Sequence, residues 1–266
     1  SALFKYSTVE KFARLINNEE EISKDCLVPL KPNGSKIPLF IVHGAGLNIL
    51  SFLNLIEHFE EDQPVYGIQG TAKGTDEWYE SIEEMAAHYI DAIIKINPNG
   101  PYALVGFSIG GIITFEMARQ LNERGKKVSL IAVLDTYVHP HYTYTFFQKK
   151  LAKNYDSTLR KVKKAKDILM GWKKIKNQKE SITLNDNIIF SDEEALAEEE
   201  YNKSSQLIFN IIDRYHLKPQ DFEVELFRSI DDENNKLVAL DSGWNSIALK
   251  GVNINHLPGE HMDLIG

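Results

Sequence analysis

The chain has 266 residues, of which 43% are hydrophobic, and this is enough material for one large α/β domain with its own core. A formal net charge of -8 argues against bulk nucleic-acid binding, and a single cysteine, Cys26, excludes an intramolecular disulfide framework and is typical of a reducing compartment. The chain has no run of about 18 apolar residues and no signal peptide at its start, so we expect a cytoplasmic protein without a membrane partner.

The first residues differ in pattern from the rest of the chain. Residues 7–10, Ser-Thr-Val-Glu, form a capping box, and apolar residues follow it at helical spacing. Residues 21–36 are polar and contain Pro29, Pro32 and Gly34, which is a linker composition. The sequence therefore predicts a helix within residues 1–20 that belongs to another domain, a linker over 21–36, and a main domain over 37–266.

Strand and helix patterns alternate along residues 37–134. The predicted strands are residues 37–43, 64–68, 101–105 and 128–134, and the predicted helices are residues 51–59, 81–96 and 112–124. This alternation predicts an α/β fold with a mostly parallel, twisted sheet flanked by helices on both faces.

The alternation stops after residue 134. Residues 137–217 show only helical patterning, and two more strands are predicted at 222–230 and 252–257. A helical insertion between two strands predicts a lid over the carboxyl ends of the strands, where open α/β sheets place their sites. Within it, residues 148–179 carry twelve Lys or Arg residues against two acidic residues, and we interpret this segment as a solvated face of a lid helix.

The segment Gly106-Phe107-Ser108-Ile109-Gly110 lies between a predicted strand and a predicted helix. A sharp strand-to-helix turn crowds the serine, so small residues are needed two positions before it and two positions after it. The turn leaves the hydroxyl at a helix N-terminus, where developing negative charge is stabilised. A Gly-rich turn without chemistry is the alternative, but strand, turn and helix are all present, and the pattern predicts Ser108 as a nucleophile.

A serine needs a base, and the base follows the last strand in sheets of this kind. His261 lies in the loop Pro258-Gly259-Glu260-His261, beyond the last predicted strand, where it can reach Ser108. His256 lies inside that strand and is more typical of a packed or hydrogen-bonded residue. We therefore expect His261 to be the base.

The acid that orients the base has two candidate places. Asp135 ends the apolar strand that follows the nucleophile's helix, whereas Asp231 and Asp232 end the next strand. Both places are sterically possible. The run from Asp231 to Asn235 is typical of a solvated turn, so we favour Asp135.

A tetrahedral intermediate needs two backbone N–H donors. We expect one from Ile109, after the nucleophile, and one from Ala45 in the loop His43-Gly44-Ala45-Gly46, with His43 as a structural support of that loop. The histidines lack metal-ligand spacing, and residues 70–75 lack the glycine spacing of a phosphate-binding loop. We expect no metal.

Together these motifs resemble a known family. They are residues 40–46 (FIVHGAG), 65–69 (VYGIQ), 100–111 (GPYALVGFSIGG), Leu134-Asp135 and 258–261 (PGEH). They are similar to the C-terminal thioesterase domains of nonribosomal peptide synthetases and polyketide synthases, which belong to the α/β-hydrolase superfamily. The resemblance runs from about Leu27 to the end of the chain, apart from the lid.

The resemblance implies a function in natural product biosynthesis. Ser108 would take an acyl or peptidyl chain from the phosphopantetheine of an upstream carrier domain, and hydrolysis or cyclisation would release it. No cofactor is expected in this chain itself. The family places its acid as Asp135 is placed, whereas stand-alone editing thioesterases place it one strand later. For the basic segment 148–179, the resemblance adds docking of an acidic carrier domain as an alternative.

The resemblance also bears on the two ends. Residues 3–13 are similar to the last helix of a carrier domain, so the chain is expected to be a piece of a multidomain synthetase. The family continues with a helix after its histidine, whereas this chain ends five residues past His261. A stand-alone editing thioesterase, a general serine esterase and a non-catalytic binding module are the alternatives, and the carrier-like helix argues against the first two.

Overall fold

The computed structural model describes residues 25–70, 78–138, 205–231 and 240–265. The predicted helix within residues 1–20, the basic segment and most of the predicted lid lie outside the described residues. So does Asp232, one of the candidate acids.

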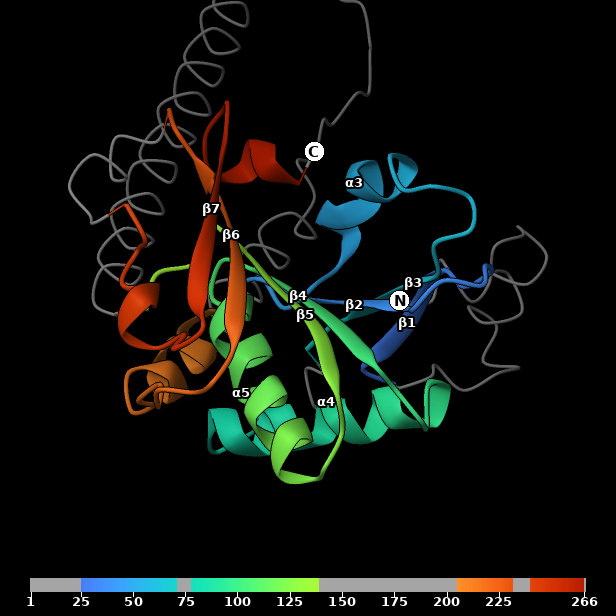
Figure 1. Cartoon of the computed structure of the whole chain (residues 1–266), viewed down its shortest axis with the longest axis horizontal. Helices are drawn as coiled ribbons and strands as arrows, with labels where there is room; N and C mark the ends of the chain where they lie inside the picture. The colour runs from blue at the N-terminus through green and yellow to red at the C-terminus, as the bar shows by residue number, and fades with distance from the viewer. Residues whose placement is uncertain (1–24, 71–77, 139–204, 232–239, 266) are drawn as a thin grey trace, which may run out of the picture. The chain divides into compact units, whose positions relative to one another are not determined.

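The described residues form one seven-stranded sheet with the strand order β1-β3-β2-β4-β5-β6-β7 (Figure 1). All neighbouring strands are parallel except β1, which runs antiparallel to β3. The strands are β1 (Leu27–Lys31), β2 (Leu39–Val42), β3 (Val65–Ile68), β4 (Tyr102–Phe107), β5 (Val128–Leu134), β6 (Glu223–Ser229) and β7 (Gly251–Leu257). The predicted mostly parallel sheet is confirmed.

Strand β1 corrects the linker prediction. Residues 21–36 have a linker composition, yet residues 27–31 pair with β3, with Val28 opposite Gly67. Pro29 concealed the strand in the sequence, because proline lacks the N–H that an interior strand needs. An edge strand tolerates it, and the register shifts between Pro29 and Lys31.

Helices cover both faces of the sheet (Figure 1). Helices α4 (Ile82–Ile96) and α5 (Gly110–Glu123) pack together against one face. The other face is covered by η1 (Leu50–Phe52), α3 (Leu53–Glu57) and η4 (His261–Leu264), whose apolar side chains join those of the strands in one core cluster. Within the described residues, the remaining helical elements are η3 (Trp244–Ser246) and residues 205–212.

Helix α4 begins one residue after its predicted start, and the other two predicted helices differ more. The helix predicted over 51–59 is a 3-10 turn followed by the short helix α3, neither of which has a side-chain cap at its N-terminus. Helix α5 begins at Gly110, two residues before the predicted start. Glycines indicate a turn in a sequence pattern, but here they lie in the first helical turn because the helix closely approaches its neighbours.

A buried carboxylate joins α5 to residues 205–215. Glu116 is 1% exposed, and its carboxylate accepts hydrogen bonds from Arg119, Gln120 and the Tyr215 hydroxyl, the last at 2.7 Å. Burial raises the pKa of the Glu116 carboxyl, but these hydrogen bonds outweigh that effect and hold the pKa below its ordinary value. The carboxylate therefore stays charged and ties the two segments together.

A second buried contact joins α4 to the loop after β2. His43 is fully buried, its Nε2 lies 2.7 Å from the Tyr89 hydroxyl, and its Nδ1 lies 2.7 Å from the Gly44 carbonyl oxygen. A carbonyl only accepts, so Nδ1 carries the proton and Nε2 accepts from Tyr89. Burial lowers the pKa of His43 from 6.5 to about 4, against a smaller opposing effect of the Gly44 carbonyl.

We predict that His43 makes the fold acid-sensitive. Its pKa is lower in the folded than in the unfolded chain, so its stabilisation is complete above about pH 6.5 and is lost as the pH falls toward about 4. Between about pH 8 and about pH 4.5, this histidine should cost the wild type about 2.5 kcal/mol of unfolding free energy. Urea unfolding measures the free energy of unfolding at both pH values. The loss of this free energy at the lower pH should be smaller in His43→Gln than in wild type, by the same amount. An equal loss in both proteins would contradict the prediction.

Candidate active site

Ser108 lies on a strained turn between β4 and α5. Its φ is 57°, in the left-handed region that residues with a side chain rarely adopt. The Ser108 N–H donates to the Leu134 carbonyl at 2.8 Å, and its carbonyl accepts from the Thr136 hydroxyl at 2.6 Å. The Ser108 hydroxyl is buried and has no hydrogen-bond partner within the described ranges. The backbone is therefore held while the Oγ is left available.

The glycines around Ser108 allow this close packing. A Cβ on Gly106 would lie 2.5 Å from the Gly110 carbonyl oxygen, and a Cβ on Gly110 would lie 2.2 Å from the His43 carbonyl oxygen. A Cβ on Gly111 would lie 2.2 Å from the Thr136 hydroxyl. The backbone atoms beside Gly106 and Gly110 cannot move aside. Residues without a side chain are therefore needed two positions before Ser108 and two positions after it.

Asp135 follows β5 directly and is 2% exposed. Its backbone N–H donates to Phe227 on β6 at 2.7 Å. Its Oδ2 accepts from the Ser229 hydroxyl at 2.8 Å and from His261 Nδ1 at 2.7 Å, and its Oδ1 accepts from the Ser229 N–H at 3.3 Å. Several donors therefore hold this buried carboxylate in one orientation.

His261 begins η4 and is 2% exposed. Besides its contact with Asp135, its ring stacks on Phe107, with ring centroids 4.7 Å apart and planes at 29°. Phe107 is the residue before Ser108, so this stacking places the imidazole beside the turn of Ser108. Because Nδ1 donates to the carboxylate, Nε2 is the nitrogen that can take a proton.

The other candidate acid holds the loop of His261. Asp231 is exposed, its Oδ2 accepts from the Gly259 N–H at 2.7 Å, and its own N–H donates to the Gly259 carbonyl at 3.2 Å. Among the described residues, Asp135 is thus the carboxylate that contacts His261. His256 lies in β7, as predicted, but its side chain is exposed on this edge strand rather than packed.

The two predicted oxyanion donors lie in adjoining segments. Ile109 follows Ser108, and Ala45 lies in the loop after β2, where a Cβ on Gly44 would lie 3.1 Å from the Phe107 ring. In the described part of the chain, the N–H groups of Ile109 and Ala45 donate to no other protein group. His43 supports this loop, as predicted, through its contact with Gly44.

Sequence reasoning missed the residues that orient these groups. Ser229 is the last residue of β6, and Thr136 follows Asp135. The aromatic residues Phe107 and Tyr89 lie in β4 and α4. A hydrophobic pattern assigns the aromatic residues to the core, and no local signal marks either hydroxyl as a contact of Asp135 or Ser108. Thr136 directly follows the predicted acid in the sequence, and this position was the one available hint of a role at the site.

Other kinds of site find little support in the described ranges. They hold no group of three or more His, Cys, Asp or Glu side chains suited to a metal ion. Burial raises the pKa of Cys26 to about 11, which keeps the thiol protonated and unreactive. No helix within these ranges has the length and apolar character needed to cross a bilayer.

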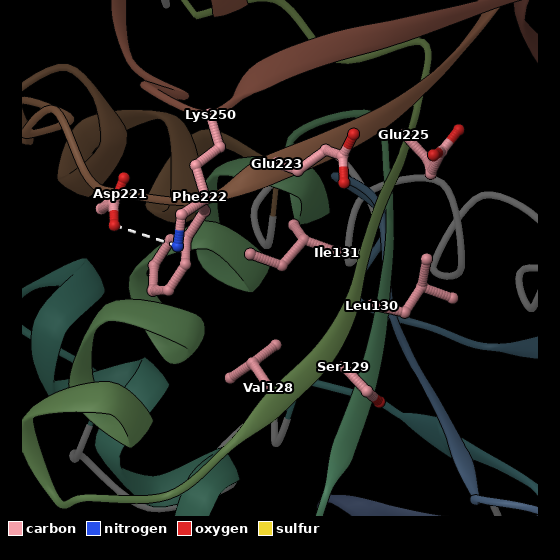
Figure 2. Close-up of a pocket in the computed structure, with 9 residues that line it drawn as sticks. All are labelled: Val128, Ser129, Leu130, Ile131, Asp221, Phe222, Glu223, Glu225 and Lys250. Atoms are coloured by element: carbon pink, nitrogen blue, oxygen red, sulfur yellow. Dashed lines mark ion pairs between the residues drawn. The ribbon is translucent and has the colours of Figure 1, made fainter.

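A cavity of about 260 Å³ lies apart from these residues, between the amino-terminal halves of β5 and β6 (Figure 2). Val128 to Ile131 line one side, and Glu223 and Glu225 line the other. An ion pair between Lys250 and Asp221, at 2.9 Å, lies beside Phe222. Ser108 and Asp135 lie at the carboxyl ends of their strands, so this cavity is not the candidate active site.

Solved structures share the fold. A four-domain nonribosomal peptide synthetase bound to AMP and glycine matches with a TM-score of 0.70 and 24% identity, over 99% of this chain and 21% of that chain. The NocB thioesterase domain from the nocardicin cluster matches with a TM-score of 0.64 and 18% identity, over 90% of this chain and 91% of that chain. These matches confirm the predicted α/β-hydrolase fold.

Curated relatives are much longer proteins. Malpinin synthetase from Mortierella alpina is 39% identical over 140 residues, which are 50% of this chain and 2% of that protein. The dimodular nonribosomal peptide synthase of Bacillus subtilis (strain 168) is 39% identical over 137 residues, 51% of this chain and 6% of that protein. An inactive atromentin synthetase of Paxillus involutus is 32% identical over 145 residues, 52% of this chain and 15% of that protein.

The family model described as Thioesterase domain matches residues 37–266. The matched range contains the strained turn of Ser108, the buried Asp135 and the His261 loop. It covers most of the chain and confirms the resemblance that the motifs indicated. The chain belongs to the thioesterase domain family.

Proposed function

We propose that this domain releases an acyl or peptidyl chain from the phosphopantetheine arm of a carrier domain in a nonribosomal peptide or polyketide synthetase. The observation that carries the proposal is the buried hydrogen bond between Asp135 and His261, whose ring stacks beside the turn of Ser108. The family match supports thioester chemistry. The long synthetases among the relatives support a carrier domain as the partner.

The site can perform the reaction in two halves. His261 Nε2 takes the proton of Ser108 while Oγ attacks the thioester carbonyl, and Asp135 stabilises the imidazolium that forms. The oxyanion accepts hydrogen bonds from the N–H groups of Ile109 and Ala45. Collapse of the intermediate expels the phosphopantetheine thiol, which takes the proton from His261.

The second half releases the product. Water, or a hydroxyl or amine within the acyl chain itself, gives its proton to His261 and attacks the acyl-Ser108 ester. The new bond frees Ser108, which regains its proton from the same imidazole. Water gives an acid and an internal nucleophile gives a ring, so hydrolysis and cyclisation use the same residues.

We predict that a fluorophosphonate probe will label the wild type on Ser108 and will not label Ser108→Ala. The reaction needs an activated serine, which the turn and His261 provide. Intact-protein mass spectrometry measures the added mass. Ser246→Ala is the matched control, because Ser246 is an exposed serine whose hydroxyl donates to the Gly243 carbonyl. A binding module without catalysis would leave the wild type unlabelled.

We predict that Asp135→Asn lowers kcat on a short acyl thioester by about 10⁴-fold, because the amide no longer stabilises the imidazolium or fixes the tautomer. Thiol release measures the rate. Asp231→Asn should stay near the wild-type rate, since an asparagine oxygen can still accept from the Gly259 N–H. The opposite ranking of the two variants would move the acid to Asp231.

A further inference from the structure

We propose that Ser205 is a positioning residue for the oxyanion hole, and that it acts by holding the carbonyl group of Ala45. The Ser205 hydroxyl donates to the Ala45 oxygen at 3.2 Å, across a sequence separation of 160 residues. Both residues are buried, at 2% and 3% exposure. The inference rests on the proposed function, because it assigns a role at the same site.

The peptide bond before Ala45 is held by other contacts. Its carbonyl, that of Gly44, accepts from the Leu47 N–H at 3.1 Å and lies 2.7 Å from His43 Nδ1. In a trans peptide the C=O and N–H bonds point in opposite directions. Fixing the Gly44 oxygen therefore aims the Ala45 N–H to the opposite side.

The peptide bond after Ala45 depends on Ser205. Within the described residues, the Ser205 hydroxyl is the hydrogen-bond donor that reaches the Ala45 oxygen. A buried carbonyl without a donor is unfavourable, so loss of the hydroxyl favours rotation of this peptide toward another partner. The two peptides share the Cα of Ala45, so a shift of the second peptide displaces this Cα and moves the Ala45 N–H out of line.

Other contacts also hold the segment that carries Ser205. Tyr215 anchors residues 205–215 through its 2.7 Å contact with buried Glu116, and Arg214 donates to the Glu80 carbonyl at 3.1 Å. Ile208, Ile211 and Ile212 are buried in the same segment. With these anchors in place, the Ser205 hydrogen bond acts chiefly on the loop of Ala45.

The test compares Ser205→Ala with wild type on two substrates, a 4-nitrophenyl ester and its thionoester, in which sulfur replaces the carbonyl oxygen. Amide donors stabilise a developing oxyanion far better than a thiolate-like sulfur. Deleting one such donor costs about 10²–10³ in kcat, so misaligning one should cost about tenfold on the ester with KM unchanged. The ratio of ester to thionoester rates should fall by a similar factor.

Ser129→Ala is the matched control. Its hydroxyl also donates to a backbone carbonyl, that of Tyr102, at 3.2 Å, but it lies near the start of β5 and away from the site. Both rates and their ratio should stay at the wild-type values in this variant. Ser205→Cys, which keeps the side-chain volume and weakens the donor, replaces Ser205→Ala should the latter not fold.

Three outcomes distinguish a failure of the inference about Ser205 from a failure of the proposed function. A wild-type rate and ratio in Ser205→Ala overturn the inference and leave the proposed function standing. Equal losses on both substrates, together with a lower melting temperature, reduce Ser205 to a structural residue and also overturn it. A wild type that turns over neither ester, with Ser108 unlabelled by the fluorophosphonate, refutes the proposed function itself.

Discussion

The structure depends on the steric crowding around Ser108. The left-handed backbone of this residue is held where the ends of three parallel strands meet, and the space there is so small that a Cβ on Gly110 would lie 2.2 Å from the His43 carbonyl oxygen. The same close approach, at Gly111, brings Thr136 against the turn. One packing constraint therefore brings together the loop after β2, Ser108 and the residue that follows Asp135. Local strain of this kind persists only where the surroundings over-determine it, and here β4 is buried along its whole length.

Burial decides which of two neighbouring carboxylates can serve the histidine. Asp135 and Asp231 follow adjacent strands at the same edge of the sheet. Asp135 is buried, and the donors Ser229 and His261 hold its carboxylate in one orientation. Asp231 is exposed, and its Oδ2 accepts a hydrogen bond from the Gly259 N–H, in the turn that leads to His261. The two acids thus support one histidine in different ways, one through its ring and one through its backbone.

Local patterns predicted the features that depend on local physics. The Gly-x-Ser-x-Gly spacing reflects crowding within one turn, and the strand and helix periodicities reflect one buried face, so the turn, the sheet and the order of elements could be read from the sequence. Strand β1 was missed because Pro29 is unfavourable in a strand interior, although an edge strand accepts it. The contacts that support the site join residues far apart, such as Tyr89 with His43 or Ser229 with Asp135, and no local pattern encodes such pairs. An aromatic residue in a buried helix face is consistent with packing alone, which is why Tyr89 gave no signal.

The contacts that hold the loop of Ala45 connect it to both α5 and α4. Glu116 on α5 holds Tyr215, which follows the helical residues 205–212, and Ser205 in those residues contacts the Ala45 carbonyl. Helix α5, which begins just after Ser108, and the loop of Ala45 are thus joined through one segment. From the other side, α4 reaches the same loop through Tyr89 and His43. This arrangement requires a neutral, buried His43. A protonated ring would make Nε2 a donor, and the Tyr89 hydroxyl would then have to accept a hydrogen bond instead of donating one. The loop is therefore held before any substrate arrives, and a preformed pair of donors stabilises an oxyanion without the cost of reorienting them.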